Sequence, residues 1–144
     1  MIRKTLAALG LAAALAAPAA AEMEDRLVTV VTSAEPQTQL MSMVLTMQAV
    51  QKGVETHVLL CGPAGDMALA AAPDSVTAPQ PPRDMSPQGL LKAAIENGAT
   101  VEVCAIYLPG RGEGPEVLIE GVGVAQPPAM AEKLLDDDAA VWSF

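Results

Sequence analysis

The sequence predicts an α/β domain of three layers, in which helices cover both faces of a mostly parallel five-stranded sheet. The first observation is that short β-branched and apolar segments alternate with segments of helical length. This alternation is typical of parallel sheets covered on both faces. The second is that glycine or proline stands at most of the boundaries between these segments, where turns are expected. The third is length, because 144 residues with an N-terminal leader fit one hydrophobic core.

The N-terminal 21 residues have the pattern of a secretory signal peptide. Arg3 and Lys4 precede an apolar run over residues 6–17, and alanines at 19–21 form a small-residue cleavage site. A buried N-terminal helix is the competing interpretation, which the uninterrupted apolar run disfavours. We therefore expect export to the periplasm or the medium, and a single mature domain over residues 22–144.

The first half of the mature chain predicts two strands and two helices. Residues 27–32 form a buried strand, and residues 38–52 form a helix that ends before a glycine. The apolar stripe of this helix is Leu40, Val44, Met47 and Val50. Residues 55–60 form the second strand, which ends at Cys61, and a short helix covers residues 64–71.

A proline-rich segment separates the two halves. Residues 72–87 contain five prolines and little hydrophobic periodicity, which predicts either a surface insertion or a lid over a site. Ser86 is placed to cap a helix over residues 88–97. A third strand over residues 100–106 follows and contains Cys104.

The last part of the chain continues the alternation. A Gly/Pro loop follows the third strand, and residues 115–120 form one or two helical turns. Residues 121–125 form a short fourth strand, residues 127–136 a helix with proline near its start, and residues 140–144 a C-terminal strand.

Over residues 27–144 the chain resembles the DsrE/DsrF-like sulfur-relay family. The resemblance rests on the opening strand, on Gly53 and the strand ending in Cys61-Gly62, on Gly89 to Gly98 leading into Val101-Glu-Val-Cys104, on the spacing Cys104-x6-Arg111-Gly112, and on the terminal Val141-Trp-Ser-Phe. It implies an α/β/α domain that forms homo-oligomers, trimers or hexamers, and a Cys104 thiol that accepts sulfane sulfur as a persulfide and passes it to a thiol-bearing partner protein. Some members have a second cysteine where this chain has Tyr107.

The residues themselves also direct attention to Cys104. A thiol at the carboxyl end of a parallel strand lies where ligands bind in open α/β sheets. Arg111 is the nearest cation in the sequence and would lower the pKa of the thiol. The amides of Gly110 and Gly112 would form an anion-binding loop. The alternative is a buried structural cysteine in a non-catalytic oligomeric binding module.

Cys61 is either a resolving thiol at the same edge of the sheet or a small apolar residue at a strand end. We expect the strand order 2-1-3-4-5, in which the first strand separates the two cysteine-bearing strands. Their separation would then be about 10 Å, which exceeds the roughly 7 Å that a disulfide tolerates. The order therefore predicts no bond between Cys61 and Cys104.

Other functional classes have weaker support in the sequence. Met43 and Met47 share a helix face and suggest either Cu(I) binding or core packing. The lone His57 lies within a strand pattern, and Glu113 and Glu116 are either an acid–base pair or solvated loop carboxylates. We predict no metal and no cofactor. The net charge of −9 and the scarcity of aromatic residues argue against a nucleic-acid partner, and we expect no membrane association after signal cleavage.

Overall fold

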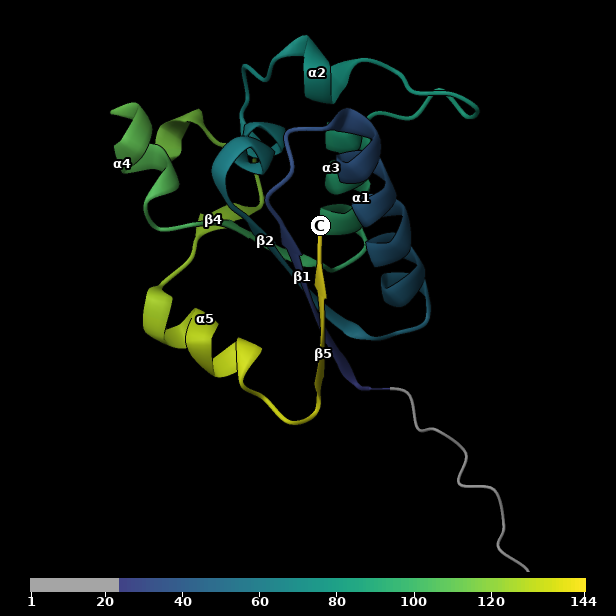
Figure 1. The fold of residues 1–144 in the computed structure, drawn as a ribbon, viewed down its shortest axis with the longest axis vertical. Coiled ribbons are helices and arrows are strands. Elements are labelled where there is room, and N and C mark those ends of the chain that lie inside the picture. The colour runs from purple at the N-terminus through teal and green to yellow at the C-terminus, as the bar shows by residue number, and fades with distance from the viewer. Residues whose placement is uncertain (1–23) are drawn as a thin grey trace, which may run out of the picture.

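The computed structural model describes residues 24–144, so the predicted signal peptide lies outside the described residues. Its centre is a five-stranded sheet in which every pairing is parallel (Figure 1). The strands are β1 (Arg26–Val31), β2 (Glu55–Leu60), β3 (Thr100–Val103), β4 (Val122–Val124) and β5 (Ala139–Ser143). The predicted fold class is confirmed.

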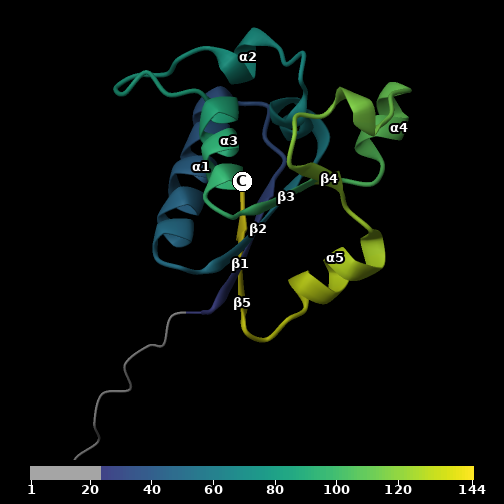
Figure 2. The ribbon, with the colours of Figure 1, turned by 180° about the vertical axis from the view of Figure 1, so that it is seen from behind.

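Helices lie on both faces of this sheet (Figures 1 and 2). The long helices α1 (Pro36–Gln51) and α3 (Pro87–Glu96) pack against each other on one face, and α5 (Pro127–Leu134) lies on the other. The shorter elements are α2 (Asp74–Thr77), α4 (Tyr107–Arg111) and two 3-10 helices, η1 (Gly62–Ala68) and η2 (Pro115–Val117). None of the helices described is long and apolar enough to cross a membrane.

The strand order is β4-β3-β2-β1-β5, and the predicted order 2-1-3-4-5 is wrong. Crossovers between parallel strands are right-handed, so the face on which a connecting helix packs decides the direction in which the chain moves across the sheet. Because α1 and α3 pack together on one face, β1, β2 and β3 follow one another in a single direction. The α5 connection lies on the opposite face and returns the chain to the free edge of β1.

Both long helices begin with a side-chain cap and a proline in the first turn, of which only the start of α3 was predicted. The Ser86 hydroxyl accepts a hydrogen bond from the Gly89 amide at 3.1 Å, which confirms the predicted cap of α3. In α1 the Glu35 carboxylate accepts from the Thr38 amide at 3.0 Å, so the helix begins at Pro36, two residues before the predicted start. These contacts satisfy amides that have no partner within the helix.

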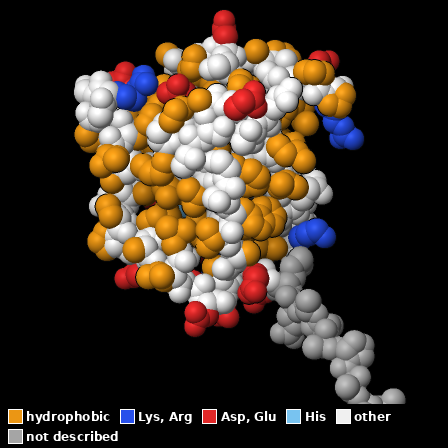
Figure 3. Space-filling model, viewed as in Figure 1, with side chains coloured by type: hydrophobic (Ala, Val, Ile, Leu, Met, Phe, Trp, Pro, Cys, Tyr) orange, Lys and Arg blue, Asp and Glu red, His pale blue; other side chains and the backbone are white. Residues whose placement is uncertain are grey.

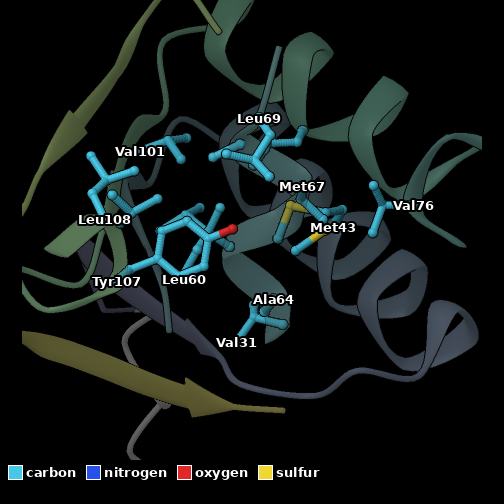
Figure 4. Close-up of a cluster of buried hydrophobic side chains, with 14 residues drawn as sticks. Val31, Met43, Leu60, Ala64, Met67, Leu69, Val76, Val101, Tyr107 and Leu108 are labelled. Atoms are coloured by element: carbon cyan, nitrogen blue, oxygen red, sulfur yellow. The ribbon is translucent and has the colours of Figure 1, made fainter. Parts of the chain in front are cut away.

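The main core lies between the sheet and the α1/α3 layer (Figure 4). The buried face of α1 differs from the predicted stripe, because Leu40, Val44 and Val50 are only partly buried whereas polar side chains face the sheet. These buried polar residues are Gln39, Ser42 and Thr46. The Thr46 hydroxyl lies 2.7 Å from the Ser42 carbonyl oxygen and 3.1 Å from the Thr29 hydroxyl of β1, which satisfies it inside the core.

The proline-rich segment 72–87 is a surface insertion. It contains α2, whose Val76 side chain is buried, and a turn closed by a bridge between Gln80 and Met85. The turn lies against α1, across the molecule from α4 and α5 (Figure 1). The structure therefore gives no support to the prediction of a lid over the cysteine-bearing edge.

Candidate functional site at the carboxyl ends of β2 and β3

The two cysteines of the sequence form a disulfide at the carboxyl edge of the sheet. Cys61 follows β2 and Cys104 follows β3, and their Cα atoms are 5.1 Å apart. Each extends its ladder by one bond, since the Cys61 amide donates to Val31 O and the Cys104 amide to Leu60 O, both at 2.9 Å. The prediction that the two cysteines are unbonded is wrong, because β2 and β3 are neighbours and have no strand between them.

Both cysteines are partly exposed rather than buried. Cys61 packs against the small cluster beneath α5, and Cys104 packs against both this cluster and the main core. The pair therefore lies at a boundary between core and solvent. The carboxyl edge of a parallel sheet is also where α/β proteins bind ligands.

The chain turns sharply after Cys104, where the sequence predicted two more strand residues and then a Gly/Pro loop. The Tyr107 amide donates to the Cys104 carbonyl at 2.9 Å, and Tyr107–Arg111 form the single-turn helix α4. Gly112 ends this helix with φ of 70°, in the left-handed region that favours glycine. Proline and glycine within α4 mislead a sequence-based prediction, because the helix is short and held by tertiary contacts.

Tyr107 joins the segment after Cys104 to the segment after Cys61. Its hydroxyl donates to the Asp66 carboxylate at 2.7 Å, across 41 residues of sequence. Its ring is buried in the main core beside Leu60 (Figure 4). Burial, followed by the hydrogen bond to the Asp66 carboxylate, raises the pKa of Tyr107 above its ordinary value, so the phenol stays a neutral donor.

Gly65 makes this contact possible. A Cβ atom at this position would lie 2.4 Å from Cε2 of the Tyr107 ring, closer than two carbon atoms can approach. The sequence contained no indication that residues 65 and 66 of η1 meet Tyr107, because no local pattern encodes a contact over this separation. Both residues are functional-site candidates that sequence analysis missed.

Arg111 contacts carboxylates rather than the disulfide. Its Nε lies 2.6 Å from Glu113 Oε2 and its Nη1 3.4 Å from Asp66 Oδ1, while the guanidinium carbon is 5.5 Å from the centre of the Tyr107 ring. The hydrogen bond to Glu113 raises the pKa of Arg111 further. Gly110 and Gly112 are exposed beside it. The predicted anion-binding role of this loop remains a prediction, and an anion would compete with Glu113 for the guanidinium.

The other candidate residues lie away from the disulfide. Met43 and Met47 are buried core side chains of α1. His57 is buried on β2, with Nε2 2.8 Å from Glu102 Oε2 but without the geometry of a hydrogen bond. Burial lowers the pKa of His57, because the desolvation of the imidazolium outweighs the opposing attraction of Glu102. Among residues 24–144, no group of three or more His, Cys, Asp and Glu side chains is placed to hold a metal ion.

Glu116 was predicted together with Glu113 as either an acid–base pair or solvated loop carboxylates. Both residues are exposed. Glu113 contacts Arg111, and Glu116 belongs to η2. This placement agrees with the solvated alternative.

Comparison with solved structures places this fold among known ones. The chain is similar to MTH1491 of Methanobacterium thermoautotrophicum, a protein of unknown function, with a TM-score of 0.60 and 16% identity over 83% of this chain and 98% of the other. It is equally similar to the YchN protein of E. coli, with a TM-score of 0.60 and 19% identity over 83% of this chain and 99% of the other.

These structural neighbours have a DsrE/DsrF-like fold, so the predicted fold is confirmed at this level. No protein-family model and no curated protein matches the sequence. At these identities the likeness concerns the fold alone. The chemistry must therefore be argued from the residues of this chain.

Proposed function

We propose that this protein handles sulfur at the Cys61–Cys104 pair, with Cys104 as the residue that accepts sulfane sulfur. The observation that supports the proposal is the position of the pair: two partly exposed cysteines, bonded to each other, at the carboxyl ends of adjacent parallel strands. A disulfide that solvent can reach is open to attack by a thiolate, whereas a fully buried one is not.

The reaction begins from the reduced pair. The Cys104 thiolate attacks the outer sulfur of a persulfide R–S–SH, so that a bond forms between this sulfur and Cys104 while the bond to R–S breaks. R–S⁻ leaves with the electron pair, and Cys104 becomes a persulfide. A thiosulfonate donor would react in the same way, with a sulfinate as the leaving group.

Two fates are open to the Cys104 persulfide. A partner thiolate can attack its outer sulfur and take this sulfur away, which regenerates the Cys104 thiolate. Alternatively the Cys61 thiolate attacks the inner sulfur, which forms the Cys61–Cys104 disulfide and releases hydrosulfide. The 5.1 Å between the two Cα atoms makes the second fate available within one chain.

The surrounding residues have positioning roles in this proposal. Tyr107 and Asp66 hold the turn after Cys104 against the turn after Cys61. Arg111, with the amides of Gly110 and Gly112, is the candidate site for an anionic donor, and Glu113 holds its guanidinium in the absence of that donor.

We further propose that the protein works in the periplasm or outside the cell. The pattern of residues 1–21 supports export. A disulfide between the only two cysteines of the chain fits an oxidising compartment, because cytosolic disulfides are rare.

The test uses a Cys61→Ser variant, which leaves Cys104 as the only thiol and prevents its discharge by Cys61. The reduced variant is incubated with inorganic polysulfide without oxygen, and its intact mass is measured. We expect a mass gain of one sulfur atom on Cys104 that a reductant removes. The matched control, Cys104→Ser, should gain none, and wild type should release hydrosulfide and return to the disulfide form. A Cys61→Ser protein that gains no sulfur overturns the proposal.

One observation favours a second function, an oligomeric binding module in which the disulfide is only structural. β5 is an edge strand, and its Val141 and Trp142 side chains are 46% and 37% exposed. Apolar edge strands are surfaces on which further chains assemble. A second copy could therefore pair there, giving the trimer or hexamer that the family resemblance implies. If no cysteine variant gains sulfur, this second function is the one that remains.

A further inference from the structure

A groove on the α5 side of the sheet reaches the disulfide. One wall is the turn of residues 104–106, the other is α5, and Leu59 of β2 lies at its base. The groove encloses about 320 Å³. This volume is near the lower limit of the roughly 300–1,000 Å³ of small-molecule pockets, so it fits one or two side chains rather than a large cofactor.

Every side chain that lines this groove is apolar. Ile106, two residues after Cys104, is 81% exposed, and Leu134 of α5 is 36% exposed. Figure 3 shows hydrophobic side chains over the surface between α4 and α5, with acidic side chains along the lower margin. Large exposed apolar residues that gather at one groove mark a binding surface, whereas single ones do not.

The groove and the disulfide are continuous through Cys104. Cys104 lines the groove and Cys61 does not, so a molecule lying in the groove contacts Cys104 rather than Cys61. Arg111 and its carboxylate partners, Asp66 and Glu113, do not line the groove. The sulfur site therefore has an apolar approach distinct from its charged surroundings.

We propose that this groove binds the apolar residue next to a cysteine in a partner polypeptide, and so selects the thiols with which Cys104 exchanges. The inference rests on the proposed sulfur chemistry and names its substrate class. Small anionic thiols gain nothing from an uncharged groove, and the chain's net charge of −9 repels them. Transfer of an apolar side chain from water into this groove raises the affinity of the partner roughly ten- to hundred-fold.

The exchange requires no reactant other than two thiols of the partner and the Cys61–Cys104 disulfide. The partner thiolate attacks the Cys104 sulfur, a bond forms between the two, and the Cys61–Cys104 bond breaks. Cys61 leaves with the electron pair as a thiolate, which water protonates. A second thiol of the partner then attacks the mixed disulfide, so that the partner is oxidised by two electrons and the cysteine pair is reduced.

The test compares two synthetic peptides of equal length and net charge, one with leucines and one with serines on both sides of a single cysteine. Each is mixed with the oxidised full chain, and the rate of mixed-disulfide formation is measured by mass spectrometry. We expect the leucine peptide to react about ten-fold faster or more. Ile106→Glu and Leu134→Glu should each abolish this preference.

Leu135→Glu is the matched control. Leu135 is 81% exposed beside Leu134 but does not line the groove, so the preference should persist. Because Ile106 is as exposed as Leu135, the Ile106→Glu variant should fold, and Leu134→Glu is an independent second variant. Equal rates for the two peptides, or a preference that survives both groove variants, would overturn the inference. In that case normal reduction by dithiothreitol and normal sulfur loading of Cys61→Ser would show that the proposed function stands.

Discussion

Reduction of the Cys61–Cys104 disulfide is expected to lower the stability of the domain substantially. The bond joins residues 43 apart in the sequence. A cross-link that closes a loop of this size removes unfolded-state entropy worth about 4 kcal/mol at 25 °C in the chain-entropy model. The folded state should change little, because the Cys61 and Cys104 amides are held independently by Val31 and Leu60.

Urea unfolding with and without a phosphine reductant measures this difference. With a urea slope of about 2 kcal/mol/M for a domain of this size, a loss of about 4 kcal/mol lowers the midpoint by about 2 M. The matched control is Cys61→Ala/Cys104→Ala, whose midpoint should not respond to the reductant and should lie near that of the reduced wild type. Mass spectrometry establishes that reduction is complete.

A midpoint shift below about 0.5 M in fully reduced wild type would refute this reasoning. It would mean that the unfolded chain is already constrained between the two cysteines. If the midpoint of the double alanine variant also lies within about 0.5 M of the oxidised wild type, the small shift is a property of the chain and not a direct effect of the reductant.

Two further predictions concern single residues. Gly65→Ala places a Cβ 2.4 Å from the Tyr107 ring and should lower the free energy of unfolding, measured in urea, by about 1–3 kcal/mol. The control is Gly110→Ala, whose Cβ meets nothing within 4 Å and which should cost less than about 0.5 kcal/mol. Equal effects of the two substitutions would contradict the steric argument. Burial lowers the pKa of His57 against the attraction of Glu102, so the unfolded chain takes up a proton below about pH 6.5 that the folded chain refuses. Stability should therefore fall as the pH falls from about 7 toward the lowered pKa, and His57→Gln should flatten this dependence by up to about 1.4 kcal/mol per pH unit; an unchanged slope would assign the dependence to other groups.

The sequence was sufficient to place the five strands but not every helix. Each strand lies where an apolar run bounded by glycine, proline or charge predicts it, although β1 and β5 are displaced by one residue and β3 ends three residues before its predicted end. The short helices α2 and α4 were not predicted. The order of the strands could not be predicted in the same way. It depends on which face each connecting helix covers, and α3 joins α1 because their buried surfaces fit each other, which is a property of the tertiary packing.

The apolar stripe predicted for α1 differs from the face that the helix buries. Its apolar residues lie almost all round the helix, so apolar spacing alone does not identify the buried side. The buried Gln39 donates its side-chain amide to the carbonyl of Ser33, which precedes the helix, at 2.7 Å, while its Oε1 has no hydrogen-bond partner among the described residues. The hydroxyls of Ser42 and Thr46 contact carbonyls of the preceding turn of α1 itself. A polar residue that satisfies itself within its own helix can be buried at little cost.

The candidate site was predicted in part. Cys104 was placed correctly at the carboxyl edge of the sheet, because a strand-end position can be inferred from local sequence. Its bond to Cys61 depends on the strand order, and the contact between Tyr107 and Asp66 depends on the turn that follows each cysteine. The errors at the site therefore have two origins: the neighbour relationship of β2 and β3, and the turns that the chain makes after each cysteine.

This neighbour relationship would also allow a structural disulfide and the proposed sulfur exchange to coexist in one chain. The backbone ladder pairs Val58 with Val101 and Leu60 with Val103, so the ends of the two strands stay adjacent when the sulfurs separate. A domain of this size has a stability of roughly 5–15 kcal/mol, and a loss of about 4 kcal/mol leaves the reduced form folded. The two thiols then remain within reach of each other in both redox states, which is the condition that sulfur loading at Cys104 and discharge by Cys61 require.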